Sequence, residues 1–204
     1  MPTYGLTPNE LRRLRALRTP VLIQRYLDGL PYHHGNTAWS PRRALREGTA
    51  HCLEGAILAA AALRVNGFPP LLLDLEAIQD VDHVLAVYRR GSHWGALGKS
   101  NYAGLRYREP VYRSLRELAM SYFDQYYNLR GERTLRAYSQ PLNLRRFDGQ
   151  HWMTSEENIW YIPEHFCHVA HTSLLTAKQE RSLSRLDKRS QAAGLVGHEK
   201  KQQA

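Results

Sequence analysis

Cysteine is scarce in this sequence, and long uncharged hydrophobic runs are absent. Only Cys52 and Cys167 occur among 204 residues, which excludes a disulfide framework and predicts a reducing compartment. The longest nearly apolar stretch, 53–65, contains two charged residues and is too short to span a bilayer. Residues 1–5 also lack the basic and apolar regions of a secretion signal. We therefore expect a cytoplasmic protein with no membrane partner.

Acidic residues are also few relative to basic ones, since 28 Lys and Arg face 19 Asp and Glu and leave a net charge of +9. Segment 176–204 holds seven basic and three acidic residues, so it carries +4 of that excess. The other arginines are scattered along the chain. This pattern favours a solvated basic surface over a nucleic-acid site. A basic nucleic-acid-associated protein stays open as an alternative function.

The sequence nevertheless has enough apolar residues, 43%, for one well-packed core. Helix start signals and apolar runs predict four helices, then strands, then further helices. The expected helices are 7–17, 19–30, 40–47, 51–66, 114–128, 154–174 and 176–191, and the expected strands are 71–75, 83–88 and 93–99. This order predicts an α+β fold with antiparallel strands packed on the helix at 51–66.

The expected domain organisation is one domain over residues 1–175. Its helical N-terminal part spans 7–47, and a core with Cys52 and His83 spans 48–102. Segment 176–204 is expected to form a polar basic helix followed by a disordered tail.

The helix at 51–66 is apolar on every face, which is typical of a buried helix. Cys52 lies in its first turn, where the partial positive charge and the unpaired N–H groups of a helix N-terminus favour the thiolate. The sequence therefore predicts Cys52 as a nucleophile. The alternative is a cysteine that serves only as a small buried hydrophobic residue.

His83 begins a strand on which residues 83, 85 and 87 share one face. A histidine at this end of the strand lies at the edge of the core, where it could meet the mouth of the helix and act as a base for Cys52. The alternative is a histidine whose ring is bound by a loop carbonyl.

Four short motifs occur here in an order that resembles the transglutaminase-like superfamily, which shares its core with papain-like cysteine proteases. They are Gly48-Thr49-Ala50-His51-Cys52-Leu53-Glu54-Gly55-Ala56, Gly67-Phe68-Pro69-Pro70, Asp82-His83-Val84-Leu85-Ala86-Val87 and Trp94-Gly95-Ala96-Leu97. The resemblance covers 42–102. It implies a Cys-bearing helix packed on an antiparallel sheet, and acyl transfer from a protein, a peptide or a small amide or ester. Cys52 would attack the carbonyl, His83 would take its proton, and water or an amine would resolve the thioester.

The sequence departs from the family at three positions. His51 stands where the family usually has Asp, and Val84 follows the histidine where an aromatic residue is common. The third departure is Gly98, which occupies the position of the catalytic Asp and has no side chain. A catalytically inactive binding or scaffold domain of the same fold is therefore a second hypothesis.

Strand register suggests what could replace the missing carboxylate. If residues 91–92 form the hairpin tip, Ser100 faces His83 and is the first candidate to orient the imidazole. Asn101 is the second candidate, and Asp80 and Asp82 are also close in sequence.

Metal and cofactor motifs are weak. His168 and His171 would share a face of the expected helix 154–174, but no CxxC or HExxH motif accompanies them. Residues 98–100 read Gly-Lys-Ser, but they follow a hairpin strand and no helix begins after them, so a phosphate loop is not predicted. The sequence thus predicts no metal and no cofactor.

Overall fold

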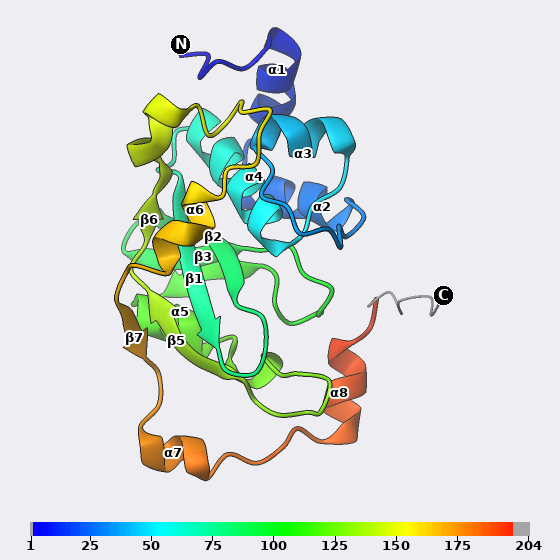
Figure 1. The fold of residues 1–204 in the computed structure, drawn as a ribbon, viewed down its shortest axis with the longest axis vertical. Helices are drawn as coiled ribbons and strands as arrows, with labels where there is room; N and C mark the ends of the chain where they lie inside the picture. Colours follow the sequence, from blue (N-terminus) through cyan, green and yellow to red (C-terminus); the bar gives the residue numbers. More distant parts are fainter. Residues whose placement is uncertain (1, 198–204) are drawn as a thin grey trace.

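An antiparallel sheet of seven strands forms the centre of the protein in a computed structural model that describes residues 2–197. The strand order is β4-β3-β2-β1-β5-β7, and the short β6 pairs with β1. Figure 1 shows the sheet with helices on both of its faces. The strands are β1 Leu71–Ala77, β2 His83–Arg90, β3 His93–Leu97, β4 Arg108–Tyr112, β5 Leu135–Ser139, β6 Leu142–Asn143 and β7 His171–Ser173.

Three N-terminal helices begin with the same device, a Thr or Ser cap followed by proline. The side chains of Thr7, Thr19 and Ser40 accept backbone N–H groups from the first turns of their helices. The expected helix starts are thereby confirmed. The helices are α1 Pro8–Ala16, α2 Pro20–Asp28 and α3 Pro41–Glu47.

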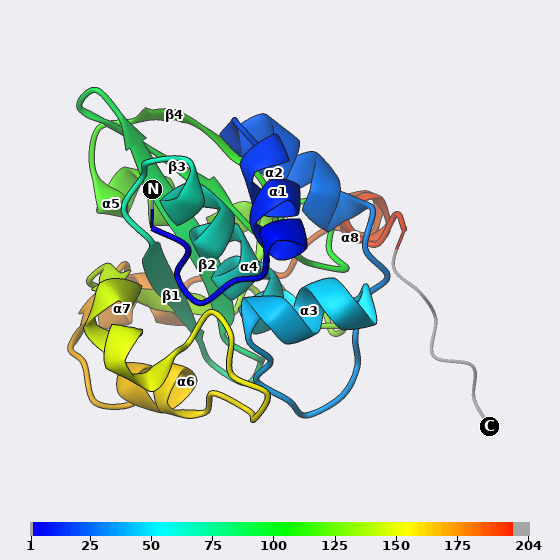
Figure 2. The same ribbon diagram turned by 90° about the horizontal axis from the view of Figure 1, so that it is seen from above.

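Helix α4, Cys52–Val65, is the buried helix that the sequence predicts. Its residues 53–63 are all buried. Helices α1, α2 and α3 contact it on one side, as Figure 2 shows, and its other side packs on β2. The β2 residues that face α4 are Val84, Ala86 and Tyr88. The Cys-bearing helix therefore has the sheet on one flank and three helices on the other.

The opposite face of the sheet has a core of its own. Leu85 and Val87 of β2 point into it and pack with Leu118 and Ala119 of α5, Leu115–Met120. Because successive side chains of a strand alternate between its faces, His83 belongs to this side and not to the α4 side. This alternation decides what each residue of β2 can reach.

The hairpin of β2 and β3 has the register expected for a two-residue tip, with Arg90 opposite His93 and Ala86 opposite Leu97. Helix α5 is shorter than the expected 114–128, because a separate 3-10 turn follows at Phe123–Gln125. Strand β6 is followed by another 3-10 turn, Leu144–Gln150.

The expected helix over 154–174 is wrong. Residues 154–160 form an irregular segment of turns and bends, and helix α6 spans only Tyr161–Phe166. Residues 171–173 form β7, which pairs with β5 and completes that edge of the sheet. The pairing partner lies over thirty residues earlier, so the local sequence pattern does not contain it.

The expected helix over 176–191 is interrupted. It consists of α7, Ala177–Arg181, and α8, Lys188–Gly194, and the side chain of Asp187 caps the second of these. Helix α8 binds the rest of the protein through the Gly194 carbonyl, which accepts the N–H of Ala103, and through Gln191, whose carbonyl accepts the Tyr127 hydroxyl. The expected disordered tail lies for the most part in 198–204, outside the described residues. No helix in 2–197 has both the length and the apolar character needed to cross a membrane.

Candidate active site

A cleft of about 980 Å³ lies at the N-terminus of α4. Its walls are the loop 32–37, the first turn of α4, the facing side chains of β1 and β2, and the segment from α6 to β7. Figure 1 shows α6 and the N-terminal end of α4 on the same face of the sheet. Three carboxylate side chains line the cleft, and no Lys or Arg of the described residues does. The acidic lining residues are Asp74, Glu76 and Asp82.

Cys52 lines this cleft as the first residue of α4. The nearby backbone N–H groups of Leu53 and Val84 and the Tyr32 hydroxyl lower the pKa of its thiol, so all three favour the thiolate. Burial outweighs them, and the pKa of the Cys52 thiol lies above its usual value. The expectation that the helix N-terminus would make this thiol acidic is therefore corrected. Burial raises the pKa of the Cys52 thiol by more than the N–H groups at the helix N-terminus lower it.

Tyr32 is a neighbour of Cys52 that the sequence did not predict. The loop at 31–33 pairs with Ala50, two residues before the thiol, through hydrogen bonds from Ala50 N to the Pro31 carbonyl and from His33 N to the Ala50 carbonyl. This pairing holds the Tyr32 hydroxyl against Sγ. Burial raises the pKa of Tyr32, so the hydroxyl remains a neutral hydrogen-bond donor at neutral pH.

Glu54 organises the mouth of α4, although its side chain is completely buried. Its Oε1 accepts the Thr37 hydroxyl at 2.5 Å and the Trp39 N–H at 3.2 Å, and its Oε2 accepts the His51 N–H at 3.2 Å. His51 is the N-cap residue, and its Nε2 lies 2.9 Å from the Thr37 carbonyl. The wall of the cleft at 33–39 is thus tied to the turn that carries Cys52.

His83 adjoins Val84, which lines the cleft, but its own ring points to the other side of the sheet, against Tyr126. The side chain is 4% exposed and packs edge-on against Tyr126. The backbone N–H of the residue that follows it, Val84, lowers the pKa of the Cys52 thiol. No hydrogen bond joins the ring to Sγ within residues 2–197, so the structure does not show the expected Cys52–His83 pair.

The imidazole of His83 is held by a backbone carbonyl. Its Nε2 lies 2.8 Å from the Leu105 oxygen, and because a carbonyl only accepts, Nε2 carries the proton and Nδ1 the lone pair. Burial lowers the pKa of His83 to about 4. A Cβ at Gly98 would lie 3.2 Å from Nε2 and 3.0 Å from the Leu105 oxygen. A side chain at position 98 would therefore approach the His83 ring right next to the Leu105 carbonyl.

Neither expected replacement for the missing carboxylate is hydrogen-bonded to His83 in the described chain. Strand β3 ends at Leu97, before the register would bring Ser100 opposite His83, and the Ser100 hydroxyl instead accepts the Tyr102 N–H. Asn101 lies with Ser100 on a separate surface hollow. The assignment of either residue as the orienter is corrected, because the chain turns away from β2 after Gly98.

The two nearby acidic residues also serve other contacts. Asp80 accepts the Thr134 hydroxyl at 2.7 Å, and Asp82 accepts the Ala77 N–H at 2.8 Å. Asp82 still lines the cleft, as noted above. Neither carboxylate is hydrogen-bonded to His83 among residues 2–197.

An Asp–His pair in the cleft was missed by the sequence analysis. Asp74 of β1 lies 3.0 Å from His171 of β7, measured from Oδ2 to Nε2, and His171 Nδ1 lies 3.1 Å from the Val169 carbonyl. Burial is the largest influence on Asp74 and raises its pKa to about 6. The only signal was a charged residue inside an apolar strand, and its partner is 97 positions away in a segment expected to be helical.

The histidines weighed as metal ligands do not come together. His171 lies in β7 and not on a helix face with His168. In residues 2–197, no three His, Cys, Asp or Glu side chains are placed to hold a metal ion.

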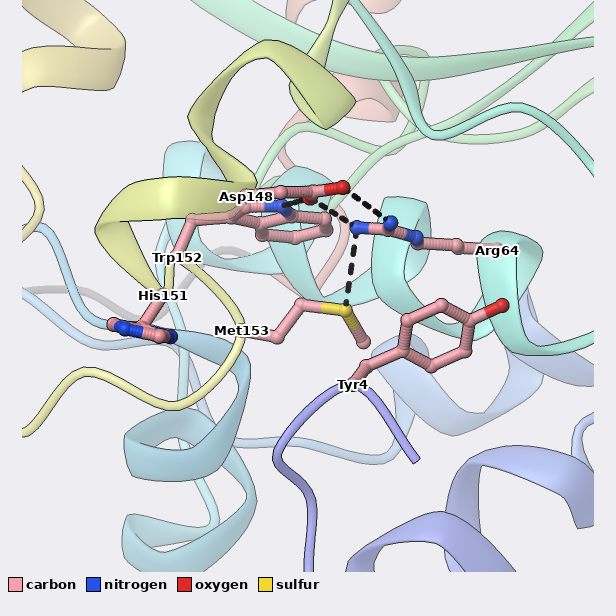
Figure 3. Close-up of a pocket in the computed structure, with 6 residues that line it drawn as sticks. All are labelled: Tyr4, Arg64, Asp148, His151, Trp152 and Met153. Carbon is pink, nitrogen blue, oxygen red and sulfur yellow. Dashed lines mark hydrogen bonds and ion pairs between the residues drawn. The ribbon is translucent and has the colours of Figure 1, made fainter. Parts of the chain in front are cut away.

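A smaller cavity, of about 170 Å³, lies at the C-terminal end of α4 (Figure 3). There Arg64 binds both carboxylate oxygens of Asp148, at 2.5 and 2.6 Å, and its guanidinium stacks 4.5 Å from the Tyr4 ring centre. Trp152 donates to the same carboxylate. These groups satisfy one another and fasten the N-terminal segment and the 144–153 segment to α4, so we assign this cavity a structural role.

Comparison with known proteins identifies no family: neither a family model nor a curated protein sequence matches this chain.

Proposed function

We propose that the protein is a thiol-dependent acyl-transfer enzyme of the transglutaminase-like type, with Cys52 as its nucleophile and His83 as the base. The observation that carries the proposal is the position of Sγ in a large cleft, where it meets two backbone N–H groups and the Tyr32 hydroxyl. Such donors stabilise negative charge on sulfur, and donors of this kind at a helix mouth can also stabilise an oxyanion on a bound carbonyl. The substrate class is a protein, a peptide or a small amide or ester.

Because the His83 ring points away from the Cys52 side of the sheet, the proposed role requires the ring to turn towards Sγ when substrate binds. Its tautomer and its neighbour suit that role. The Leu105 carbonyl leaves the lone pair on Nδ1, the atom that must accept a proton, and Val84 brings the adjoining peptide to Sγ. The raised pKa of Cys52 and the lowered pKa of His83 both favour the neutral pair. We therefore propose that the proton leaves the thiol as the sulfur attacks the carbonyl, and not before substrate binds.

Acylation by p-nitrophenyl acetate tests the nucleophile. Wild-type protein should release p-nitrophenolate with a burst and carry one acetyl group on Cys52, located by peptide mass spectrometry. Cys52→Ser should lose the burst, while Cys167→Ser, which removes the exposed thiol on the cleft wall, should keep it. Acetylation of Cys167 or of lysines at the same rate as Cys52 would overturn the proposal.

His83→Gln tests the base, because a glutamine amide can still donate to the Leu105 carbonyl but cannot accept the thiol proton. We expect acylation of Cys52 to slow by about 100-fold, the lower range for general base catalysis. Circular dichroism and the urea midpoint show that the variant is folded. An unchanged burst rate in the folded variant would remove His83 from the reaction.

A binding or scaffold domain is the second candidate function, and the pKa directions of Cys52 and His83 favour it. Its signature is a Cys52 thiol that resists both p-nitrophenyl acetate and iodoacetamide in the native protein and reacts only after unfolding in urea.

A further inference from the structure

The Asp74–His171 pair lies in the same cleft as Cys52 and has no part in the function proposed above. Asp74 is directly opposite Val84 in the β1–β2 ladder, so the two side chains point to the same face of the sheet. Val84 and Cys52 line the same cleft, where the Val84 N–H lowers the pKa of the Cys52 thiol and the Asp74 charge raises it. The carboxyl group and the sulfur therefore face the same space.

The hydrogen bonds of this pair leave one oxygen free for a ligand. The Val169 carbonyl accepts from His171 Nδ1, and His171 Nε2 lies 3.0 Å from Asp74 Oδ2. Asp74 Oδ1 has no hydrogen-bond partner among the described residues, and the side chain lines the cleft at 5% exposure. A buried carboxyl with one oxygen bound and one free has the arrangement of an acid–base group.

We propose that Asp74 is the second acid–base group of the cleft and acts on the water or amine that resolves a thioester at Cys52, with His171 as its positioning residue. This inference rests on the proposed role of Cys52. The O–H or N–H proton of the acceptor passes to Asp74 Oδ1 as the acceptor atom bonds to the acyl carbon. The C–S bond then breaks, sulfur leaves with its electron pair, and it takes the proton from Oδ1.

The pH dependence of this step follows from the groups around Asp74. Burial raises its pKa to about 6, the hydrogen bond from His171 lowers it, and the charges of Asp82 and Glu76 raise it. Cys52 faces it from α4. Since the carboxylate is the form that accepts a proton, the proposed step becomes faster as the pH rises through about 6.

The test follows the hydrolysis of acetyl-Cys52, formed with p-nitrophenyl acetate and freed of reagent, by intact mass spectrometry across the range around that inflection. Asp74→Asn keeps the shape and a hydrogen bond to His171 but removes the base. We expect it to form the thioester and to hydrolyse it at least about tenfold more slowly, without the wild-type inflection. Glu76→Gln removes one negative charge from the same face of the same strand but leaves the base, so hydrolysis should stay pH-dependent, with its inflection moved to lower pH because the Glu76 charge raises the Asp74 pKa.

His171→Ala distinguishes positioning from catalysis. Because the His171 hydrogen bond lowers the Asp74 pKa, its loss should move the inflection to higher pH and leave a pH-dependent rate. A thioester that decays in Asp74→Asn at the wild-type rate and with the wild-type profile would overturn the role of Asp74 and leave Cys52 as the nucleophile. Failure of wild-type protein to form the thioester would instead overturn the proposed function, and the role of Asp74 with it.

Discussion

Replacement of Glu54 by alanine is expected to destabilise the protein strongly, because one buried carboxylate serves three donors. The variant leaves the Thr37 hydroxyl, the Trp39 N–H and the His51 N–H without their acceptor. Each buried donor left unpaired costs about 1–3 kcal/mol, so for three donors we expect a total loss of about 3–9 kcal/mol. Against a typical stability of about 5–15 kcal/mol, this is a large fraction.

Urea unfolding, followed by tryptophan fluorescence and circular dichroism, measures this loss. Glu117→Ala is the matched control, since Glu117 also occupies the third position of a helix and accepts a backbone N–H, that of Arg113 at 2.7 Å, but is exposed. We expect the control to lose about 1 kcal/mol or less, because water replaces the carboxylate there. A Glu54→Ala variant no less stable than Glu117→Ala would refute the account of how the cleft wall is held.

Three further predictions concern the packing at Gly55, the pH dependence from His83, and the Arg64–Asp148 ion pair at the C-terminal end of α4. Gly55→Ala should destabilise the protein by about 1–3 kcal/mol in urea unfolding despite its better helix propensity, because the new Cβ would overlap the Cβ of Lys99. His83 should make the protein sensitive to acid: its pKa is lowered to about 4, so the stability that it contributes is complete above the unfolded value of about 6.5 and is lost as the pH falls towards 4. His83→Gln should lack that part of the pH dependence of the urea midpoint. Asp148→Asn should cost about 1 kcal/mol through the loss of its charged contact with Arg64, and the difference from wild type should shrink in about 1 M salt because the carboxylate is nearly half exposed.

Local patterns were sufficient to predict the parts of the fold that depend on near neighbours. The Thr or Ser cap followed by proline marks α1, α2 and α3, and the uniformly apolar stretch marks α4 as buried. The register of the β2–β3 hairpin also followed from its two-residue tip. Each of these features is decided by residues within about ten positions of one another, so the sequence pattern contains the whole cause.

The features that failed depend on distant partners. Strand β7 has three residues and forms only by pairing with the edge of β5, so its own sequence does not predict a strand. His171 owes its place beside Asp74 to that pairing. The direction of the Cys52 pKa shift was wrong for the same reason. The helix N-terminus is a local property of the sequence, whereas the burial that raises the pKa depends on distant segments around residues 32 and 84.

The sequence offered two interpretations of His83, as the base for Cys52 or as a histidine bound by a loop carbonyl. Gly98 shows how both can hold for the same ring. At position 98, where the resemblance to the transglutaminase-like superfamily implies a carboxylate, there is no side chain, and a loop carbonyl, that of Leu105, binds Nε2 beside it. A carbonyl fixes the tautomer as a carboxylate would, but it carries no charge to stabilise an imidazolium. A His83 held in this way can accept a proton only while the substrate draws electrons from sulfur. If the proposed function holds, the missing carboxylate slows the formation of the thiolate without preventing acyl transfer, and it increases what a separate carboxyl such as Asp74 must contribute.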